Sequence, residues 1–157
     1  MIEATKTKTF WKIAFIVVFI IYLLLLFYLT FFSHIYGRGY FHRSINLIPL
    51  KTILQYVSSQ LPIKIIVVNL FGNIGAFVPM GFLLPLIFSK CSNSLRVVLI
   101  SIGVSMFIEI IQYSFGVGAA DADDLILNLA GGLAGYAIYS LARFAKLSYL
   151  KKFGNCE

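Results

Sequence analysis

Charged residues are scarce in this chain of 157 residues. Only 12% of the residues are Asp, Glu, Lys or Arg, whereas 60% are hydrophobic, and the mean hydropathy is +0.92. In an average soluble domain roughly a quarter of the residues are charged. The shortage of charge therefore excludes an ordinary soluble domain and predicts a membrane protein.

Acidic residues are the scarcer of the charged kinds, with 6 Asp and Glu against 13 Lys and Arg, which gives a net charge of +7. A positive balance can indicate a nucleic-acid partner. Here the basic residues are scattered between apolar blocks and form no continuous basic face for a phosphate backbone. We therefore expect no nucleic-acid partner and interpret membrane lipids, the anionic ones above all, as the partners of the positive charge.

Cysteine and histidine are also nearly absent. Cys91 and Cys156 have no close Cys or His neighbours of the kind that a zinc site or a redox pair needs. The spacing of His34 and His42 relative to the carboxylates matches no known pattern of metal ligands. We therefore predict no metal site, and the sequence identifies no cofactor.

Long apolar runs take the place of charge. Four runs are long enough to cross a hydrocarbon core of about 30 Å, and since unpaired backbone groups are not tolerated in lipid, each is predicted to be a helix. They are Ile13 to Phe32, Ile65 to Phe88, Val97 to Phe115 and Leu125 to Ala142. The first run follows three lysines, as a signal peptide would, but no small-x-small cleavage site follows it, so we expect a retained anchor. With no internal repeat, residues 1–157 are expected to form a single domain.

The distribution of Lys and Arg predicts the orientation. With the N-terminus inside, nine basic residues fall in cytoplasmic segments: Lys6, Lys8, Lys12, Lys90, Arg96, Arg143, Lys146, Lys151 and Lys152. Four fall outside: Arg38, Arg43, Lys51 and Lys64. We therefore expect both termini in the cytoplasm, with the 34–64 connection and the aspartates at 121–124 on the outer side.

The 34–64 connection carries a structural signal of its own. Apolar residues recur at helical spacing at positions 50, 53, 54, 57 and 61, polar residues face away from them, and Pro49 suits a first helical turn. This pattern predicts an extracytoplasmic helix that is either amphipathic and interfacial or re-entrant. The expected fold is an all-α integral membrane protein with four transmembrane helices plus this helix between the first and second.

The third apolar run contains a carboxylate. Ser101, Ser105, Glu109 and Gln112 share one helical face by their spacing. A carboxylate at this depth costs on the order of 3 kcal/mol unless it is paired, hydrated or protonated, so an intramembrane Glu is by default a functional candidate. The alternative is a neutral Glu109 in an interhelical hydrogen bond.

Polar residues also interrupt the second and fourth runs. Asn69 and Asn73 are four residues apart and lie on one face. They are either site residues or, like Gly131 and Gly135 at GxxxG spacing, contacts that hold helices together.

At the start of the fourth run, Asp121, Asp124 and Asn128 are predicted to share a face. Asp123 points elsewhere, and we expect it to cap its own helix.

With the expected orientation, these polar residues all fall in the outer half of the membrane, which predicts an outward-facing polar pocket. Glu109 and Asp124 are the catalytic candidates, the first as acid or base. The substrate-binding candidates are Asn46, Asn69, Asn73, Gln112, Asp121, Asp123, Asn128 and Arg43. His34, Arg38 and His42 lie on the same side.

Four segments, "SINLIPLKTI", "NIGAFVPMGFLLP", "IEIIQ" and "DADDLILNLAGGLAGY", resemble the successive motifs of the VanZ-like family of bacterial membrane proteins, across about residues 44 to 139. The matching positions are Asn46, Pro49, Asn73, Pro79, Gly81, Glu109, Gln112, Asp121, Asp123, Asp124 and Asn128. Many members carry a Gly-Arg pair before the aspartates. Here "YSFGVGAAD" has no Arg, so the source of that cation is open unless Arg38 or Arg43 supplies it.

The resemblance implies a multi-pass protein of the bacterial plasma membrane, in a family whose namesake is associated with resistance to teicoplanin, a lipid-bearing glycopeptide. We expect a site in the outer leaflet that acts on or senses a cell-envelope amphiphile, either a lipid-linked cell-wall precursor or a lipoglycopeptide. The alternatives are a non-enzymatic assembly or regulatory subunit and a small transporter. The sequence leaves open whether the protein is an enzyme and whether it forms a homo-oligomer.

Overall fold

The computed structural model describes residues 2–32, 45–116, 118 and 120–153. Its elements are α1 (Ile2–Phe31), β1 (Ile45–Asn46), α2 (Lys51–Ser58), α3 (Ile63–Ile87), a short 3-10 helix (Ser89–Cys91), α4 (Ser94–Phe115), β2 (Ala120–Asp121) and α5 (Ala122–Phe153). Within these residues, four helices are long and apolar enough to cross a membrane: α1, α3, α4 and α5. The prediction of an all-α membrane protein with four spans is confirmed.

The helix bounds differ from the predicted runs mainly in the first and last helices. Helix α1 begins at Ile2 instead of Ile13, and α5 continues to Phe153 instead of ending at Ala142. The predicted run stopped where lysine and arginine begin. Lys, Leu and Arg are good helix formers, and a helix needs no lipid around it to continue. Hydropathy therefore located the apolar part of this helix and missed its last three turns.

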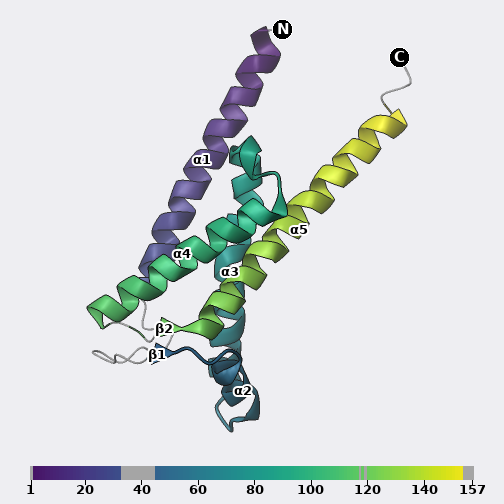
Figure 1. Ribbon diagram of the computed structural model, residues 1–157. Coiled ribbons are helices and arrows are strands. Elements are labelled where there is room, and N and C mark those ends of the chain that lie inside the picture. Colours follow the sequence, from purple (N-terminus) through teal and green to yellow (C-terminus); the bar gives the residue numbers. More distant parts are fainter. Residues whose placement is uncertain (1, 33–44, 117, 119, 154–157) are drawn as a thin grey trace.

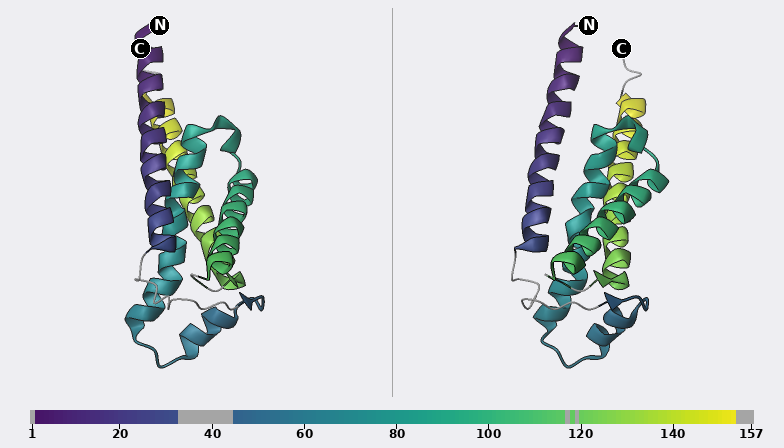
Figure 2. Two further views of the ribbon diagram at one scale, coloured as in Figure 1. Left: turned by 90° about the vertical axis from the view of Figure 1, so that its left-hand side faces the viewer. Right: turned by 60° about the vertical axis from the view of Figure 1, so that its left-hand side comes forward.

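The two ends of the helical bundle differ in content (Figure 1). The start of α1 and the end of α5 lie at one end, together with the connection between α3 and α4, whereas α2, β1 and β2 lie at the other end. The further views show the same separation (Figure 2). The described part of the 34–64 connection and the aspartates at 121–124, which were predicted to face the same side, thus lie at a single end of the bundle.

Helices α3 and α5 form the closest contact in the bundle, because glycines let their backbones touch. A Cβ atom added at Gly131 would overlap the carbonyl oxygen of Ile74, and one at Gly135 would overlap that of Val78. At Gly81 it would overlap the carbonyl of Gly132. The predicted close approach at Gly131 and Gly135 is confirmed.

Helix α1 is attached through a single stripe. Phe19, Tyr22 and Leu26 pack on a core cluster that includes Phe77 and Met80 of α3. The rest of α1 presents exposed apolar side chains, as a lipid-facing helix does.

A short parallel pairing joins β1 to β2, with Ile45 opposite Ala120 and Asn46 opposite Asp121. No sequence pattern predicted it, because two-residue strands have no periodicity. It places Asn46 beside the first turn of α5, 75 residues away in sequence.

Replacing Gly81 by Ala should destabilise the protein by roughly 1 to 3 kcal/mol, the usual cost of overpacking, because α3 and α5 must separate. The check is the thermal unfolding midpoint in detergent micelles. Gly75→Ala is the matched control on the same helix, since a Cβ there meets nothing within 4 Å. Equal midpoints for the two variants would contradict the assigned α3–α5 contact.

Candidate functional site

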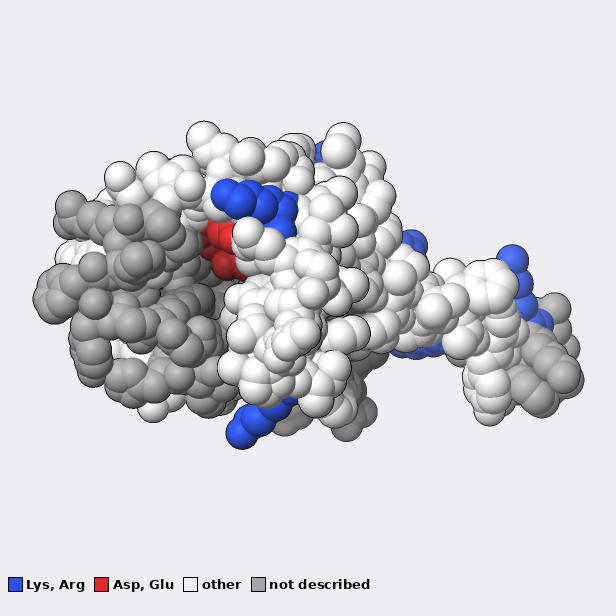
Figure 3. Space-filling view, turned by 90° about the horizontal axis from the view of Figure 1, so that it is seen from below, with Lys and Arg blue, Asp and Glu red and all other residues white. Residues whose placement is uncertain are grey.

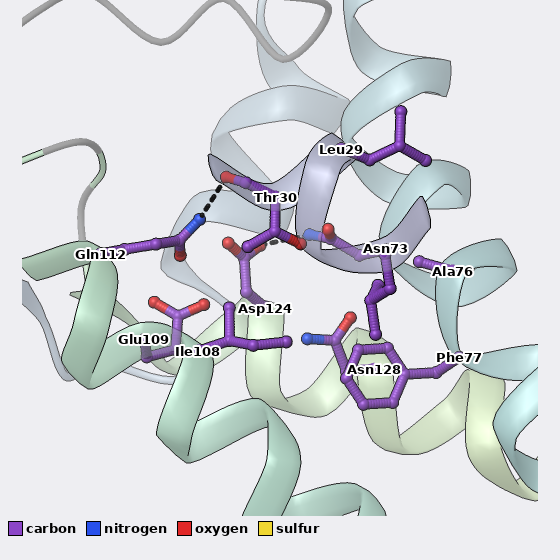
Figure 4. A pocket seen from close by; sticks show the side chains of 11 residues that line it. Leu29, Thr30, Asn73, Ala76, Phe77, Ile108, Glu109, Gln112, Asp124 and Asn128 are labelled. Atoms are coloured by element: carbon purple, nitrogen blue, oxygen red, sulfur yellow. Dashed lines mark hydrogen bonds between the residues drawn. The ribbon is translucent and has the colours of Figure 1, made fainter. Parts of the chain in front are cut away.

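A pocket lies between the four spans near the end that carries α2 (Figure 4). Every span contributes to its lining, which consists of Leu26, Leu29 and Thr30 of α1, Asn73, Ala76 and Phe77 of α3, Ile108, Glu109 and Gln112 of α4, and Asp124 and Asn128 of α5. Five of the residues proposed from sequence are therefore brought together: Asn73, Glu109, Gln112, Asp124 and Asn128.

Interhelical hydrogen bonds hold the amide side chains of this pocket. The Asn73 Nδ2 atom donates to Asp124 Oδ1 at 2.5 Å, which joins α3 to α5. The Asn128 Nδ2 atom donates to the hydroxyl oxygen of Ser105 at 2.8 Å, which joins α5 to α4. The polar faces predicted on three spans do meet, and each amide orients a neighbouring acceptor.

Glu109 is half-buried and connects the pocket to β2. Its Oε2 atom accepts a hydrogen bond from the backbone N–H of Asp121 at 3.0 Å. Glu109 thus lines the pocket and also holds the start of α5 against α4.

Gln112 brings the end of α1 into the site, a contribution that the sequence did not suggest. The side chain is 2% exposed, and its Nε2 atom donates to the backbone carbonyl of Thr30 at 3.2 Å. Thr30 is itself buried and lines the pocket. The first run is almost wholly apolar, so periodicity gave no reason to assign one of its residues to a polar site.

A second polar cluster lies beside the pocket and is centred on Asp121. The Asn46 Nδ2 atom donates to Asp121 Oδ1 and to Thr52 Oγ1, both at 3.0 Å. The Thr52 hydroxyl donates to Asp121 Oδ2 at 2.6 Å. Asp121 also caps α5, since its Oδ1 accepts from the backbone N–H of Asp123 at 2.9 Å.

The expectation that Asp123 caps its own helix is wrong. Its carboxylate is fully buried and accepts from the backbone N–H groups of Leu50 at 2.5 Å and Ile53 at 3.0 Å. These are the first-turn donors of α2, which have no partner within that helix. Asp123 therefore caps α2, and Asp121 takes the position at α5 that was assigned to Asp123.

The cap also explains an unusual backbone. Leu50 has φ 67°, a left-handed conformation that costs roughly 1 to 2 kcal/mol for a residue with a Cβ. The bond from its N–H to Asp123 stabilises this turn. Helix α2 consequently begins at Lys51, and Pro49 precedes the helix instead of occupying its first turn.

Four of the described candidates do not line the pocket: Asn46, Asp121 and Asp123, which lie in the cluster beside it, and Asn69. Asn69 does not line it, and its Nδ2 atom donates to the carbonyl of Ile65 in its own helix at 2.8 Å. Asn69 and Asn73 are four residues apart on one helix, as predicted. The pocket begins at the level of Asn73, however, and Asn69 lies one turn before it. Arg43 lies outside the described residues, as do His34, Arg38 and His42.

Tyr56 of α2 is a further neighbour that the sequence did not indicate. Burial raises the pKa of its phenol, and the nearby charges of Asp124 and then Asp121 raise it further. The phenol therefore stays protonated across the physiological range. Tyr56 thus lies near Asp124 of the pocket lining and Asp121 of the cluster beside it.

Four of the six acidic residues in the chain are gathered here: Glu109, Asp121, Asp123 and Asp124. Seen from this end, acidic side chains appear in a hollow with a basic side chain beside them (Figure 3). Among the described residues, no three His, Cys, Asp or Glu side chains form a group that could hold a metal ion. The pocket offers carboxylate and amide oxygens, which accept hydrogen bonds from a ligand.

Comparisons with known proteins give one consistent match. A family model described as VanZ/LLP1 matches residues 19–143. The chain is similar to Protein VanZ of Enterococcus faecium, with 29% identity over 126 residues that cover 78% of this chain and 71% of that relative. No solved structure matches the chain.

Replacing Asp123 by Asn should loosen α2, because an amide presents an N–H group to one of two backbone donors. We expect a loss of roughly 1 to 3 kcal/mol, the cost of an unsatisfied buried group. The measurement is hydrogen exchange of the Leu50 and Ile53 amides, which should become faster. Asn93→Ala, which removes the cap of Leu95 at the other end of the bundle, is the control and should leave these two amides protected. Unchanged exchange in the Asp123 variant would refute the cap.

Proposed function

The chain belongs to the VanZ/LLP1 family, and from this premise we propose that its pocket binds a cell-envelope amphiphile in the outer leaflet of the bacterial plasma membrane. The observation that carries the proposal is the set of six polar side chains, two of them carboxylates, that converge between apolar spans. Intramembrane carboxylates are expensive and usually functional. The protein either acts on the amphiphile or senses it, and in doing so confers resistance to a teicoplanin-type glycopeptide.

The lining favours a ligand with two chemically different parts. Asn73, Glu109 and Asp124 offer oxygen atoms, while Leu29 and Ile108 offer apolar surface to the same space. A lipid-linked cell-wall precursor and a lipoglycopeptide both join an alkyl chain to a polar headgroup. In a catalytic version of the proposal, Glu109 acts as acid or base and Asp124 orients the substrate.

A non-enzymatic assembly or regulatory subunit is the second candidate, and one observation favours it. Asn46, Asp121 and Asp123 bond to the protein itself and hold α2, β1 and β2 together. These three were candidates for substrate binding, and this bonding gives them a structural use. A small transporter has less support, because the lining of the pocket lies towards one end of the spans.

Charge-neutral replacement of the carboxylates tests the proposal. In a teicoplanin-susceptible bacterium that expresses the chain, Glu109→Gln and Asp124→Asn should return the inhibitory concentration of teicoplanin to that of the empty vector. Asn69→Ala is the matched control outside the pocket and should keep the phenotype. Vancomycin, tested in parallel, separates recognition of the lipid chain from recognition of the glycopeptide core.

The amount of membrane-inserted protein distinguishes the two candidates. If resistance falls while the protein level stays constant, the polar groups act on a ligand. If resistance falls only in proportion to lost protein, they serve assembly. Full resistance in both carboxylate variants would contradict the proposal that the pocket binds the amphiphile.

The proposed orientation has its own test, in a background with Cys91→Ala and Cys156→Ala. Ser58 of α2 and Ser92 after α3 are both exposed and lie at opposite ends of the bundle. With both termini in the cytoplasm, an impermeant maleimide should label Ser58→Cys in intact cells and Ser92→Cys only after lysis. The opposite labelling would invert the topology.

A further inference from the structure

The pocket is too small for the ligand assigned to it, and the inference drawn from this rests on the proposed function. The space between the lining side chains is about 380 Å³ when its open mouth is included. The part that is enclosed has room for about one or two water molecules. Pockets that hold organic ligands are usually at least about 300 Å³ and enclose most of the ligand. One wall must therefore move before an alkyl-bearing molecule can enter.

Helix α1 is the wall with the least packing. Within its span 11% of the residues are buried, against 39% in α3. Helices α3 and α5 touch through their backbones at Gly81 and Gly131, so parting them breaks the closest contact of the bundle. By contrast, α1 packs chiefly on α3 through one stripe of side chains. Movement of α1 opens the pocket at the smallest loss of contact.

Two of the hydrogen bonds that α1 makes to other helices lie at the level of the pocket. The Tyr22 hydroxyl donates to the backbone carbonyl of Ala76 in α3 at 2.8 Å. Gln112 of α4 donates to the carbonyl of Thr30, in the last turn of α1. Each bond joins one side chain to one backbone oxygen, so it can be released without breaking a helix. Ala76, Thr30 and Gln112 all line the pocket, which puts both bonds at its edge.

The lining is mixed, and its two carboxylates lie on the same side. In Figure 4, Glu109, Gln112 and Asp124 lie on one side together with Ile108, whereas Leu29, Ala76 and Phe77 lie on the other together with Asn73 and Asn128. Carboxylates only accept hydrogen bonds when ionised, so the headgroup of the ligand must bring donors such as hydroxyl, amide or ammonium groups. Its alkyl chain would lie against Leu29, Ala76 and Phe77.

We propose that α1 is a lateral gate, whose C-terminal half moves away from α4 and admits an alkyl-bearing ligand with a hydrogen-bond-donating headgroup from the bilayer. Opening releases the bonds of Tyr22 and Gln112. The chain of the ligand then replaces the contacts that Leu26 and Leu29 make in the closed state. Helices α3 and α5 stay together throughout.

Distances between spin labels in lipid nanodiscs test the gate. One pair is placed on Phe27 of α1 and Phe107 of α4, and a reference pair on Phe71 of α3 and Ile138 of α5. All four side chains face outward and none lines the pocket. Cys91 and Cys156 are replaced by alanine. Tyr22→Phe removes one bond of α1, and Tyr28→Phe removes an exposed hydroxyl from the same helix as the matched control.

We expect the α1–α4 pair to show a shorter and a longer distance. The longer population should rise about threefold in Tyr22→Phe, as the mean strength of an interhelical hydrogen bond in a bilayer implies, and should not change in Tyr28→Phe. Added teicoplanin should shift the same pair in the unmodified helices, and vancomycin should not. The α3–α5 pair should keep a single distance in every sample, which also reports that each variant is folded.

A single α1–α4 distance that neither Tyr22→Phe nor teicoplanin alters overturns the gate. So does a change in the α3–α5 pair that accompanies opening, because a different wall would then be moving. The comparison of Tyr22→Phe with Tyr28→Phe uses no ligand and no resistance assay. A gate that opens in a protein without a resistance phenotype would therefore count against the proposed function alone.

Discussion

The backbone contact between α3 and α5 is the constraint on which the site depends. Gly81, Gly131 and Gly135 let the two helices approach until carbonyl oxygens lie where side chains would otherwise be. Asn73 of α3 can reach Asp124 of α5 only because the helices are this close. In a bilayer no hydrophobic effect presses helices together, so small residues and interhelical hydrogen bonds supply the association. The same contact therefore stabilises the bundle and presents a carboxylate to the pocket.

The acidic residues separate into two groups with different surroundings. Asp121 and Asp123 are used by the protein itself: they cap helices α5 and α2 and bond to Asn46 and Thr52. Glu109 and Asp124 face the pocket between the spans. Of the three carboxylates at 121–124, two therefore cap helices and one lines the pocket. They differ because successive residues at the start of a helix point in different directions.

Much of this could be predicted from sequence, and the failures have physical reasons. The four spans, the shared faces of the polar residues and the close approach at Gly131 and Gly135 follow from hydropathy and helical periodicity, which are local properties. The cap of α2 by Asp123 and the contact of Gln112 with Thr30 depend on which helices become neighbours, and no local pattern encodes that. The position of Asn69 outside the pocket lining was missed for a related reason: periodicity gives the direction of a side chain but not how far along a helix the pocket extends.

Asp121 connects the pocket to the structure that covers the same end of the bundle. Its backbone N–H bonds to Glu109 in the pocket lining, while its carboxylate bonds to Thr52 of α2. Tyr56 of α2 in turn lies near enough to Asp124 and Asp121 for their charges to raise its pKa. A ligand that moves Glu109 would therefore disturb α2 through Asp121, and a ligand that moves Asp124 would disturb it through Tyr56. Asp123 and Asp121 hold α2 at its first turn, so the position of α2 should respond to an occupied pocket.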